Sequence, residues 1–372
     1  MATVLGSSQS STTPVPQSAD RALVVVVAHD GRRFLDACLR SLLLAGVDAA
    51  RVIVVDNDSA DGSSALIHNH FPAVQVLHST VNLGYGGASN LGVREAGRTA
   101  GVWDGVEYLA FLNQDVVSGP GWVDQLVAAL DRDPSAAVAT PKILLKSDPG
   151  LVNACGNNVH PTGITTCRGY GRPASEHTST TPVAAVSGAA FVIRKQVFEA
   201  LGGFDPLFFM YLEDTDLSLR VALAGFGAVS VPDAVVYHDF EPSFASSKVH
   251  WLERNRVVLL AKLFRWRSLL LLFPALVVTE LLVLAYASVH GPGVVVAKAQ
   301  AYTWLIRNIA RVRESRRRTQ ARRRISDREL LARFAWQLDV TELRDWRATF
   351  VAALANALYG AWWRIARRVI AW

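Results

Sequence analysis

Near its N-terminus the sequence carries an uninterrupted apolar run, LVVVVA, at Leu23–Ala28. Valines dominate the run and no polar residue alternates with them, which is typical of a strand buried on both faces of a parallel sheet. Comparable short runs follow at Val52–Val55, Val74–Leu77 and Tyr108–Leu112, and a stretch with helical spacing, Phe34–Leu44, lies between the first two strands. This alternation of strands and helices predicts an open α/β sheet.

Composition divides the 372 residues into three parts. Residues 1–20 are rich in Ser, Thr, Pro and Gln and predict a disordered leader without the cationic and apolar regions of a secretory signal. Residues 21–245 continue the α/β pattern, with a long Gly-, Thr- and Ser-rich loop expected between His160 and Pro182. Residues 246–372 change to long stretches that are either apolar or rich in arginine, so we expect an all-α region there.

The positive charge of the protein is concentrated in one segment. The formal net charge is +6, but Arg307–Arg328 holds ten arginines against Glu314 and Asp327, so the rest of the chain is slightly acidic. No nucleic-acid partner is expected, because the neighbouring residues are apolar and no nucleic-acid-binding module is recognisable. Beside apolar helices, an arginine segment of this kind favours binding to anionic membrane lipids over a solvated linker.

Polar residues follow the predicted strands at the edge where open parallel sheets bind ligands. One such residue follows the first strand, two follow the second and two follow the fourth; they are His29, Asp56, Asp58, Asn113 and Asp115. About half of such residues cap helices and turns instead, and this alternative stays open at this stage. Asp56 and Asp115 stand at the ends of buried strands and are the strongest candidates for ligand contacts.

The segment NLGYGGASNLG at 82–92 predicts a Gly-rich turn that leads into a helix. It lacks the Gly-x-Gly-x-x-Gly order, and no Gly-x-x-x-x-Gly-Lys-Ser/Thr occurs in the sequence, so a dinucleotide-binding motif and a P-loop are both disfavoured. Glycine lets a ligand approach the backbone closely. Close approach of a ligand to the backbone of this segment is therefore plausible.

The densest group of carboxylates is YLEDTDLSLR, in which Glu213, Asp214 and Asp216 fall within four residues. Such neighbours repel one another unless a metal, a cation or a proton-transfer role accounts for them. Arg220 follows Asp216 by four residues, so a helix-face ion pair accounts for Asp216. Glu213 and Asp214 remain, beside an apolar stretch where a carboxylate can be tuned as a general base. His238 ends the next apolar strand and is either a metal ligand or a structural histidine.

Together these segments resemble family 2 glycosyltransferases with the GT-A fold, over about Ala22 to Arg256. The resemblance is carried, in this order, by VVDNDSADGS, NLGYGGASNLG, FLNQD, VSGAAFVIRKQVFEALGGFD, YLEDTDLSLR and VVYH. The sequence is most similar to the rhamnosyltransferase- and galactofuranosyltransferase-like bacterial members, and Glu253-Arg-Asn-Arg256 supports that subgroup. The resemblance implies a nucleotide-diphospho-sugar transferase with an open mixed sheet flanked by helices, followed by a membrane-associated helical region.

The resemblance also implies a donor site and a metal. Asp56 would contact the nucleoside of a nucleotide-sugar donor, and the same site would include His29, Asp58, Gly84, Asn90, Asn113 and Asp115. Asn113-Gln114-Asp115 occupies the place of the family's Asp-x-Asp motif, so Asp115 would hold magnesium or manganese on the diphosphate. His238 would be a further metal ligand. Because the first position of the motif is Asn, one anionic contact of the family is missing.

Asp214 would be the general base of an inverting transfer, and Ser187, Gly188 and Glu213 would shape the acceptor side. The implied activity moves a sugar, rhamnose or a similar one, from a nucleotide diphosphate to a lipid-linked cell-envelope saccharide. One alternative is a catalytically inactive membrane-bound scaffold with the same fold. Another is a processive polysaccharide synthase, which is disfavoured because the sequence has no Gln-x-x-Arg-Trp motif and no series of clear membrane spans.

The C-terminal part adds a membrane hypothesis. Ser268–Val289 is nearly all apolar and long enough to span a bilayer, although Glu280 and Pro274 make insertion less favourable. A single span would place the arginine segment outside the cell, against the positive-inside rule. We therefore expect a re-entrant or hairpin insertion, or helices lying in the interface, at the cytoplasmic face of the plasma membrane. Near the C-terminus, apolar residues recur at helical spacing and form one stripe: Val351, Leu354, Leu358, Trp362, Ile365 and Val369. The stripe indicates a helix that lies in the membrane interface or, alternatively, a core helix or a homo-oligomer contact.

Overall fold

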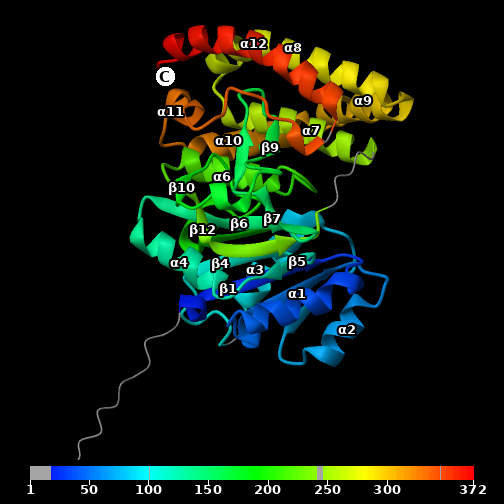
Figure 1. The fold of residues 1–372 in the computed structure, drawn as a ribbon, viewed down its shortest axis with the longest axis vertical. Helices are drawn as coiled ribbons and strands as arrows, with labels where there is room; N and C mark the ends of the chain where they lie inside the picture. Colours follow the sequence, from blue (N-terminus) through cyan, green and yellow to red (C-terminus); the bar gives the residue numbers. More distant parts are fainter. Residues whose placement is uncertain (1–17, 100, 241–245, 344) are drawn as a thin grey trace, which may run out of the picture.

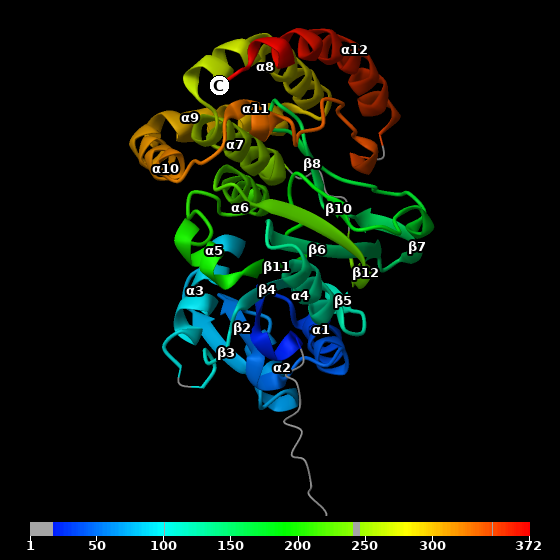
Figure 2. The ribbon, with the colours of Figure 1, turned by 90° about the vertical axis from the view of Figure 1, so that its left-hand side faces the viewer.

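The computed structural model describes residues 18–99, 101–240, 246–343 and 345–372 (Figure 1). The α/β part with its sheet lies at one end of the molecule, and the helices that follow it cover the other end (Figures 1 and 2). Of the predicted leader, residues 1–17 lie outside the described residues, and Ser18–Arg21 form a short 3-10 helix, η1. The predicted domain boundary near residue 245 also falls outside the described residues.

Among the described residues, ten strands form one mixed sheet, as predicted for this fold class. Strands β3 (Gln75–Ser79), β2 (Val52–Asn57), β1 (Ala22–Ala28) and β4 (Tyr108–Asn113) are parallel and correspond to the four predicted runs. β11 (Ala190–Arg194) is antiparallel to β4 and to β6 (Ala136–Leu145), and β12 (Gly227–His238) is parallel to β6. Short strands complete the sheet: β10 (Thr181–Pro182), β5 (Val116–Ser118) and β7 (Asp148–Ala154).

This topology gathers the predicted site at one edge of the sheet. The carboxyl ends of β1, β2, β4 and β12 point to the same edge, because these strands run in one direction. β11 runs the opposite way, so the residues just before it, 187–189, meet that edge as well. His238, the last residue of β12, therefore lies on the same side as the strand-end carboxylates.

Alternate residues of β1 are buried on opposite faces of the sheet. Val24 and Val26 share a core with α1 (Arg32–Leu44), α2 (Ser63–His70) and α4 (Trp122–Arg132). Leu23 and Val25 share a second core with α3 (Gly84–Ala96), α5 (Lys195–Leu201) and α6 (Glu213–Leu223). Every residue of β1 and β2 is buried, which explains why their sequences show no polar alternation.

The Gly-rich segment is helical rather than a turn before a helix. Helix α3 begins at Gly84 and contains the glycines that follow it. A Cβ at Gly92 would lie 2.8 Å from a Val25 methyl group of β1, and one at Gly86 would lie 2.9 Å from Cβ of Phe204. These glycines therefore let α3 lie directly on the sheet and on the loop before α6, a packing requirement that a turn motif does not reveal.

The predicted long loop between residues 160 and 182 contains short regular elements. β8 (Asn157–Val159) and β9 (Thr165–Cys167) form a hairpin, and η3 (Ala174–Glu176) precedes β10. The hairpin joins the sheet domain to the C-terminal helices, because the Ala335 N–H donates to the Val159 carbonyl at 2.9 Å. His160 adds a contact of 3.1 Å between its Nε2 and the Trp336 carbonyl.

The C-terminal part is helical, as predicted. It contains α7 (Ser246–Leu263), α8 (Trp266–Val289), α9 (Pro292–Arg307), α10 (Ile309–Ala321), α11 (Asp327–Leu331), η4 (Thr341–Leu343) and α12 (Trp346–Val369). α7 packs against α9 and α10, while α8 and α12 lie farthest from the sheet (Figures 1 and 2). Within the described ranges, one helix is long and apolar enough to cross a membrane, over Trp266–Ser288.

Glu280, in the middle of apolar α8, lies inside a polar cluster. Lys298 donates to its Oε2 at 2.8 Å and the Tyr302 hydroxyl donates to the same oxygen at 2.6 Å, both from α9. Arg256 of α7 pairs with Glu280 and also with Glu253, at 2.9 Å for the latter. The charge that makes α8 a poor isolated span is thus neutralised by its neighbours, and this face of α8 is fixed to the protein.

Part of the arginine segment stabilises the end of α7. Arg316 donates to the carbonyls of Ala261 and Phe264, the latter at 2.6 Å, and Arg323 donates to the Leu263 carbonyl. Cations at a helix C-terminus interact favourably with the helix dipole. These two arginines are therefore structural, while others in the segment, such as Arg313 and Arg317, are exposed.

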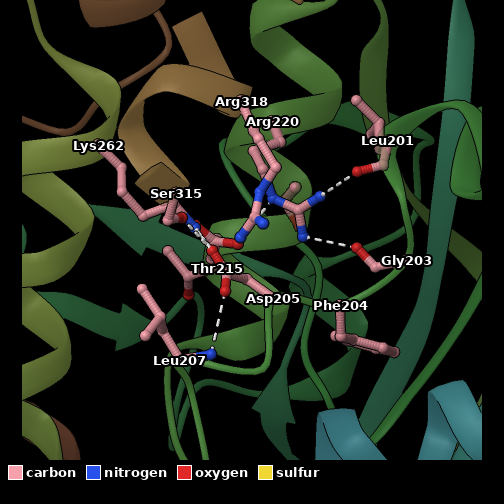
Figure 3. A network of polar contacts seen from close by, with 12 residues as sticks. Leu201, Gly203, Phe204, Asp205, Leu207, Thr215, Arg220, Lys262, Ser315 and Arg318 are labelled. Atoms are coloured by element: carbon pink, nitrogen blue, oxygen red, sulfur yellow. Dashed lines mark hydrogen bonds and ion pairs between the residues drawn. The ribbon is translucent and has the colours of Figure 1, made fainter. Parts of the chain in front are cut away.

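A buried ion cluster ties α6 and the preceding loop to α7 (Figure 3). Lys262, which is fully buried, donates to Asp216 at 2.6 Å and also pairs with Asp205. The predicted pair of Asp216 and Arg220 is present, with Nε and Oδ2 2.7 Å apart. Ser315 of α10 donates to Asp205. The orientation of α6 therefore depends on the C-terminal helices as well as on the sheet.

Candidate active site

Hydrogen bonds join the turns after β1, β2 and β4. The Gln114 side chain accepts from the His29 N–H at 2.8 Å and donates to the His29 carbonyl at 3.0 Å. The Asn57 carbonyl lies 2.9 Å from Nδ1 of His29. These contacts fix the backbone of the three turns, while the His29 side chain stays 42% exposed toward the edge of the sheet.

The two predicted aspartates after β2 differ in their surroundings. Asp56 is 1% exposed; it accepts from the Ser59 N–H at 3.1 Å and lies 3.3 Å from Nδ1 of His78. Asp58 is exposed and has a left-handed backbone, with φ 68°. Asp56 therefore shapes the turn and keeps one carboxylate oxygen beside a half-exposed histidine, and Asp58 lines the outer side of the same turn.

Asp115 and His238 come together from different strands. His238 Nε2 lies 3.4 Å from Oδ1 of Asp115, and that buried oxygen has no hydrogen-bond partner among the described residues. The Nδ1 of His238 faces Oδ1 of Asn153 at 2.9 Å. An acceptor on Nδ1 places the proton there and leaves the lone pair of Nε2 directed at Asp115, which is the tautomer that a metal-binding histidine needs.

This pair fits a divalent cation as a partial ligand set. Within the residues described, no group of three or more His, Cys, Asp or Glu side chains could hold a metal. Magnesium and related cations often take one or two carboxylates from the protein and fill the remaining positions with phosphate oxygens and water. An unpaired, buried carboxylate oxygen facing an imidazole nitrogen is consistent with that mode of binding.

Asp214 lies at the start of α6, and hydrogen bonds hold both of its oxygens. Oδ2 accepts from the Gly188 N–H at 2.7 Å and lies 3.3 Å from the side-chain nitrogen of Asn157. Oδ1 accepts from the Thr215 N–H at 2.6 Å. Burial raises the pKa of Asp214 above its ordinary value, while these donors act in the opposite direction by favouring the charged form. The result is a partly exposed carboxylate in a fixed orientation.

Glu213 is buried beside it and has a different hydrogen-bonding environment. Burial, with the charge of Asp214 as the second cause, raises the pKa of Glu213 to about 8. Its Oε2 has no hydrogen-bond partner within the described parts of the chain. Hydrogen-bond donors to both oxygens of Asp214 favour its charged form, and no such donor from the described residues reaches Glu213 Oε2. Asp214 is therefore the better proton acceptor of the two.

Tyr85 connects the two halves of the site. Its hydroxyl donates a hydrogen bond of 2.9 Å to the Gly188 carbonyl. The N–H of the same residue, Gly188, donates to Asp214. Burial raises the pKa of Tyr85 well above its ordinary value, and the charges of Glu213, Asp214 and Asp115 raise it further. Through the Gly188 carbonyl, Tyr85 therefore supports the backbone unit whose N–H orients Asp214.

The segment that leads into α6 has an unusual backbone. Tyr211 and Leu212 both have left-handed conformations, with φ 66° and 62°, which cost about 1–3 kcal/mol per non-glycine residue. The side-chain nitrogen of Asn255 donates to the Met210 carbonyl at 2.8 Å and to the Tyr211 carbonyl at 2.6 Å. Arg254 adds a hydrogen bond of 2.7 Å to the Leu207 carbonyl. The Arg-Asn pair of α7 therefore holds the strained approach to the candidate base.

The other predicted residues lie around this centre. The side-chain amide of Asn90 donates to the Phe204 carbonyl and accepts from the Phe204 N–H, both at 2.9 Å. A Cβ at Gly84 would lie 1.9 Å from the Phe209 carbonyl oxygen, so only glycine fits there. Asn113 donates its N–H to the Ala189 carbonyl at 3.0 Å, which joins β4 to the segment of Ser187 and Gly188. Asn90 and Gly84 thus contact the loop before α6.

Residues from distant parts of the sequence complete the site, and sequence reasoning did not select them: Tyr85, Gln114, Asn153, Asn157 and Asn255. Tyr85 and Gln114 lie inside motifs that were recognised, so their positions carried a signal. Asn153 and Asn157 belong to β7 and β8, which the sequence analysis did not predict as strands. Their side chains matter only because the fold brings them to His238 and Asp214.

Comparisons with known proteins identify the family of the chain and its fold. A model of the family described as Glycosyl transferase family 2 matches residues 23–202. Relatives from two strains of Mycobacterium tuberculosis are named N-acetylglucosaminyl-diphospho-decaprenol L-rhamnosyltransferase; each is 33% identical over 232 residues, which are 58% of this chain and 75% of the relative. Another relative from that organism, a pre-mycofactocin glycosyltransferase, is 28% identical over 228 residues, 60% of this chain and 43% of its own length.

Among solved structures, the crystal structure of GalNAc-T7 with UDP, GalNAc and Mn2+ is similar in fold. Its TM-score is 0.50 at 17% sequence identity, and the match covers 65% of this chain and 47% of that chain. The similarity supports the GT-A fold that the mixed sheet and its flanking helices show.

Proposed function

The chain belongs to glycosyl transferase family 2, and we propose that it moves rhamnose or a similar hexose from a nucleotide diphosphate to a lipid-linked saccharide of the cell envelope. The observation that carries the proposal is the oriented carboxylate of Asp214, which shares one edge of the sheet with the pair of Asp115 and His238. The name of the mycobacterial relatives supports rhamnose as the sugar and a diphosphate-linked lipid as the acceptor.

In this reaction Asp214 is the general base. The acceptor hydroxyl gives its proton to Asp214 while its oxygen forms a bond to the anomeric carbon, and the bond from that carbon to the diphosphate breaks. The nucleoside diphosphate leaves with the electron pair on the opposite face of the sugar, so the anomeric configuration inverts. The Gly188 and Thr215 N–H groups hold the carboxylate in place, and protonated Glu213 adds no second negative charge beside it.

The donor would lie along the turns after β1, β2 and β4. Asp56 and Asp58 are placed for the nucleoside, with His29 and Asn113 on the neighbouring turns. Asp115 and His238 would hold magnesium or manganese on the diphosphate, where the cation stabilises the charge of the leaving group. Asn90 and Gly84 contribute by fixing the loop before α6 against this site.

We also propose that α8 and α12 contact the membrane at the cytoplasmic face. The outward residues of α8 are apolar and recur at helical spacing: Leu270, Phe273, Val277, Leu281 and Leu284. On α12 the exposed apolar residues include Leu354, Leu358, Ile365 and Val369 of the predicted stripe. Because Glu280 is fixed inside the protein, the two helices would lie in the interface as a platform, and the exposed arginines of α10 would face anionic headgroups.

The test is a transfer assay on the full chain in nanodiscs. UDP- and dTDP-sugars are each paired with N-acetylglucosaminyl-diphospho-decaprenol, and the anomeric configuration of the product is read by NMR. We expect transfer from one rhamnose donor with inversion, and loss of transfer when EDTA removes divalent cations. Retention of configuration would contradict the assigned mechanism. Absence of transfer and of nucleotide release with every donor would favour the alternative of an inactive scaffold.

A further inference from the structure

A largely apolar cavity of about 260 Å³ lies between the sheet domain and the outer helices. It is enclosed by β9, α7, α8, the segment around η4, and α12. Its wall is mostly aliphatic and includes Ile164, Leu252, Leu282, Val283, Val340 and Ala352. Apolar cavities between helices are common binding sites for apolar ligands or for parts of them.

The cavity adjoins the candidate base through two elements. Leu212 lines the cavity and directly precedes Glu213 and Asp214 at the start of α6. On the other side, Thr166 of β9 lines the cavity, and β9 pairs with β8, whose Asn157 contacts Asp214. A ligand in the cavity would therefore extend toward the base.

The lining of the cavity includes the cation Lys248. Its Nζ lies 5.5 Å from the centre of the Tyr211 ring. In the described ranges it forms no ion pair with a carboxylate, whereas the other lining cation, Arg256, is paired with Glu253 and Glu280. The lining carboxylate Glu342 accepts the Cys167 N–H at 2.9 Å. Lys248 is therefore the cation of the cavity that is left to bind an anion.

The groups gathered here match an amphipathic acceptor. The site combines the proton acceptor Asp214, the lining cation Lys248 and an aliphatic wall to which α8 and α12 contribute. The outer faces of those two helices carry the exposed apolar residues of the platform, so the cavity lies beneath a surface that is itself apolar. A lipid-linked saccharide carries the matching groups: a hydroxyl, a phosphate and a hydrocarbon chain.

We propose that this cavity holds the first part of the hydrocarbon chain of the lipid-linked acceptor, with Lys248 pairing with the phosphate that joins chain and saccharide. The inference rests on the proposed function, since it assigns the acceptor of that reaction. It separates two contributions to acceptor recognition: the saccharide is bound at the sheet edge, and the lipid is bound inside the protein rather than only by the membrane.

The first test compares two acceptors that share N-acetylglucosaminyl diphosphate, one carrying a decaprenyl chain and one a methyl ester. The measured quantity is the ratio of their kcat/KM values. Each buried methylene strengthens binding by roughly fourfold, so we expect the full chain to prefer the decaprenyl acceptor by more than tenfold. Ala352→Trp, which fills the cavity, should reduce this ratio at least tenfold, whereas Ala353→Trp on the exposed side of α12 should leave it unchanged.

Two further variants test the proposal independently of the Ala352→Trp variant. Ala348 lines the cavity at a half-exposed position, so Ala348→Trp should reduce the same ratio even where Ala352→Trp folds poorly. Lys248→Gln should raise KM for the decaprenyl acceptor about tenfold and leave KM for the donor unchanged. A chain-length preference that persists in both tryptophan variants would overturn the proposal.

A binding experiment separates the cavity from the reaction. Decaprenyl diphosphate with a diazirine on its first isoprene unit is photo-crosslinked to the full chain, and the labelled peptides are sequenced. Labelling of α7, α8 and β9 at cavity residues is expected, with loss of labelling in Ala352→Trp. Labelling confined to outward residues such as Leu270 and Leu281 would overturn the cavity assignment. Cavity labelling in a protein that transfers no sugar would instead refute the proposed function and retain the lipid site.

Discussion

Replacing Asn255 with alanine should reduce turnover strongly although the residue does not touch the site of chemistry. Its side-chain nitrogen donates to two consecutive carbonyls, those of Met210 and Tyr211, at 2.8 and 2.6 Å. These bonds hold the left-handed Tyr211 and Leu212 immediately before Glu213 and Asp214. Without them the backbone is free to relax from a conformation that is costly for non-glycine residues.

The size of the effect follows from the contacts. Asn255→Ala also removes the two hydrogen bonds that Oδ1 accepts from Arg254, so four are lost in all. Each lost buried hydrogen bond costs about 1 kcal/mol net, and the fold should therefore be destabilised by about 4 kcal/mol. Release of the strained backbone should also move the start of α6. A displacement of about 1 Å in a catalytic group lowers the rate roughly 100-fold. We therefore expect kcat to fall about 100-fold, with KM for the donor little changed.

Gln320 provides a matched control. Its side-chain nitrogen also donates to two consecutive carbonyls, those of Lys262 and Leu263, at 2.6 and 2.9 Å, but away from the candidate base. Urea unfolding and steady-state kinetics are measured for both alanine variants. Gln320→Ala also removes a hydrogen bond accepted from Arg323, so it should lose a comparable stability of about 3 kcal/mol and keep its kcat within about twofold of the wild-type value. Equal losses of kcat in the two variants would refute the positioning role of Asn255, since they would show that reduced stability alone lowers activity.

Three further outcomes are expected. Lys262→Met leaves Asp205 and Asp216 without their shared cation, and removing one partner of a buried ion pair is strongly destabilising. The free energy of unfolding in urea should therefore fall by about 3 kcal/mol, and a decrease below about 1 kcal/mol would contradict this. Because burial raises the pKa of Glu213 in the folded protein from its ordinary 4.5 to about 8, its contribution to the free energy of unfolding is lost as pH rises from about 4.5 to 8. Glu213→Gln should therefore make the free energy of unfolding fall less steeply with pH over this interval, and an unchanged pH dependence in chemical unfolding would refute the assignment. Asn153→Ala removes the side chain that accepts a hydrogen bond from Nδ1 of His238, so the affinity for Mn2+ should fall about 10- to 100-fold. Calorimetry with bound UDP measures this affinity, and an unchanged value would exclude His238 as a metal ligand.

The sheet could be predicted from the sequence because its signal is local. An uninterrupted valine-rich run such as Leu23–Ala28 specifies a doubly covered strand without any knowledge of its partners. The strand-end rule then placed Asp56 and Asp115 at one edge, where the structure has them. The pair of Asp216 and Arg220 was also predictable, because its two members are one helical turn apart.

Features that depend on distant partners could not be predicted in this way. Glu280 was expected to oppose membrane insertion, but Lys298 and Arg256 neutralise it from two other helices. The glycines of α3 were expected to form a turn, and their packing against Val25 requires the tertiary fold. The sequence marks Asn255 only as part of a family motif. Its role depends on contacts with residues 210 and 211, which join α7 to a loop more than forty positions earlier in the chain, and no local pattern predicts such contacts.

The central claim is that Asp214 removes the proton of the acceptor, and Asp214→Asn tests it most directly. An asparagine keeps the size of the side chain and cannot accept the proton, so general-base catalysis worth about 100- to 10,000-fold is lost. Single-turnover transfer from a pre-bound donor is measured beside donor affinity. The account predicts wild-type donor affinity with a rate reduced by at least 100-fold. Donor affinity and transfer rate that both remain near the wild-type values would contradict it.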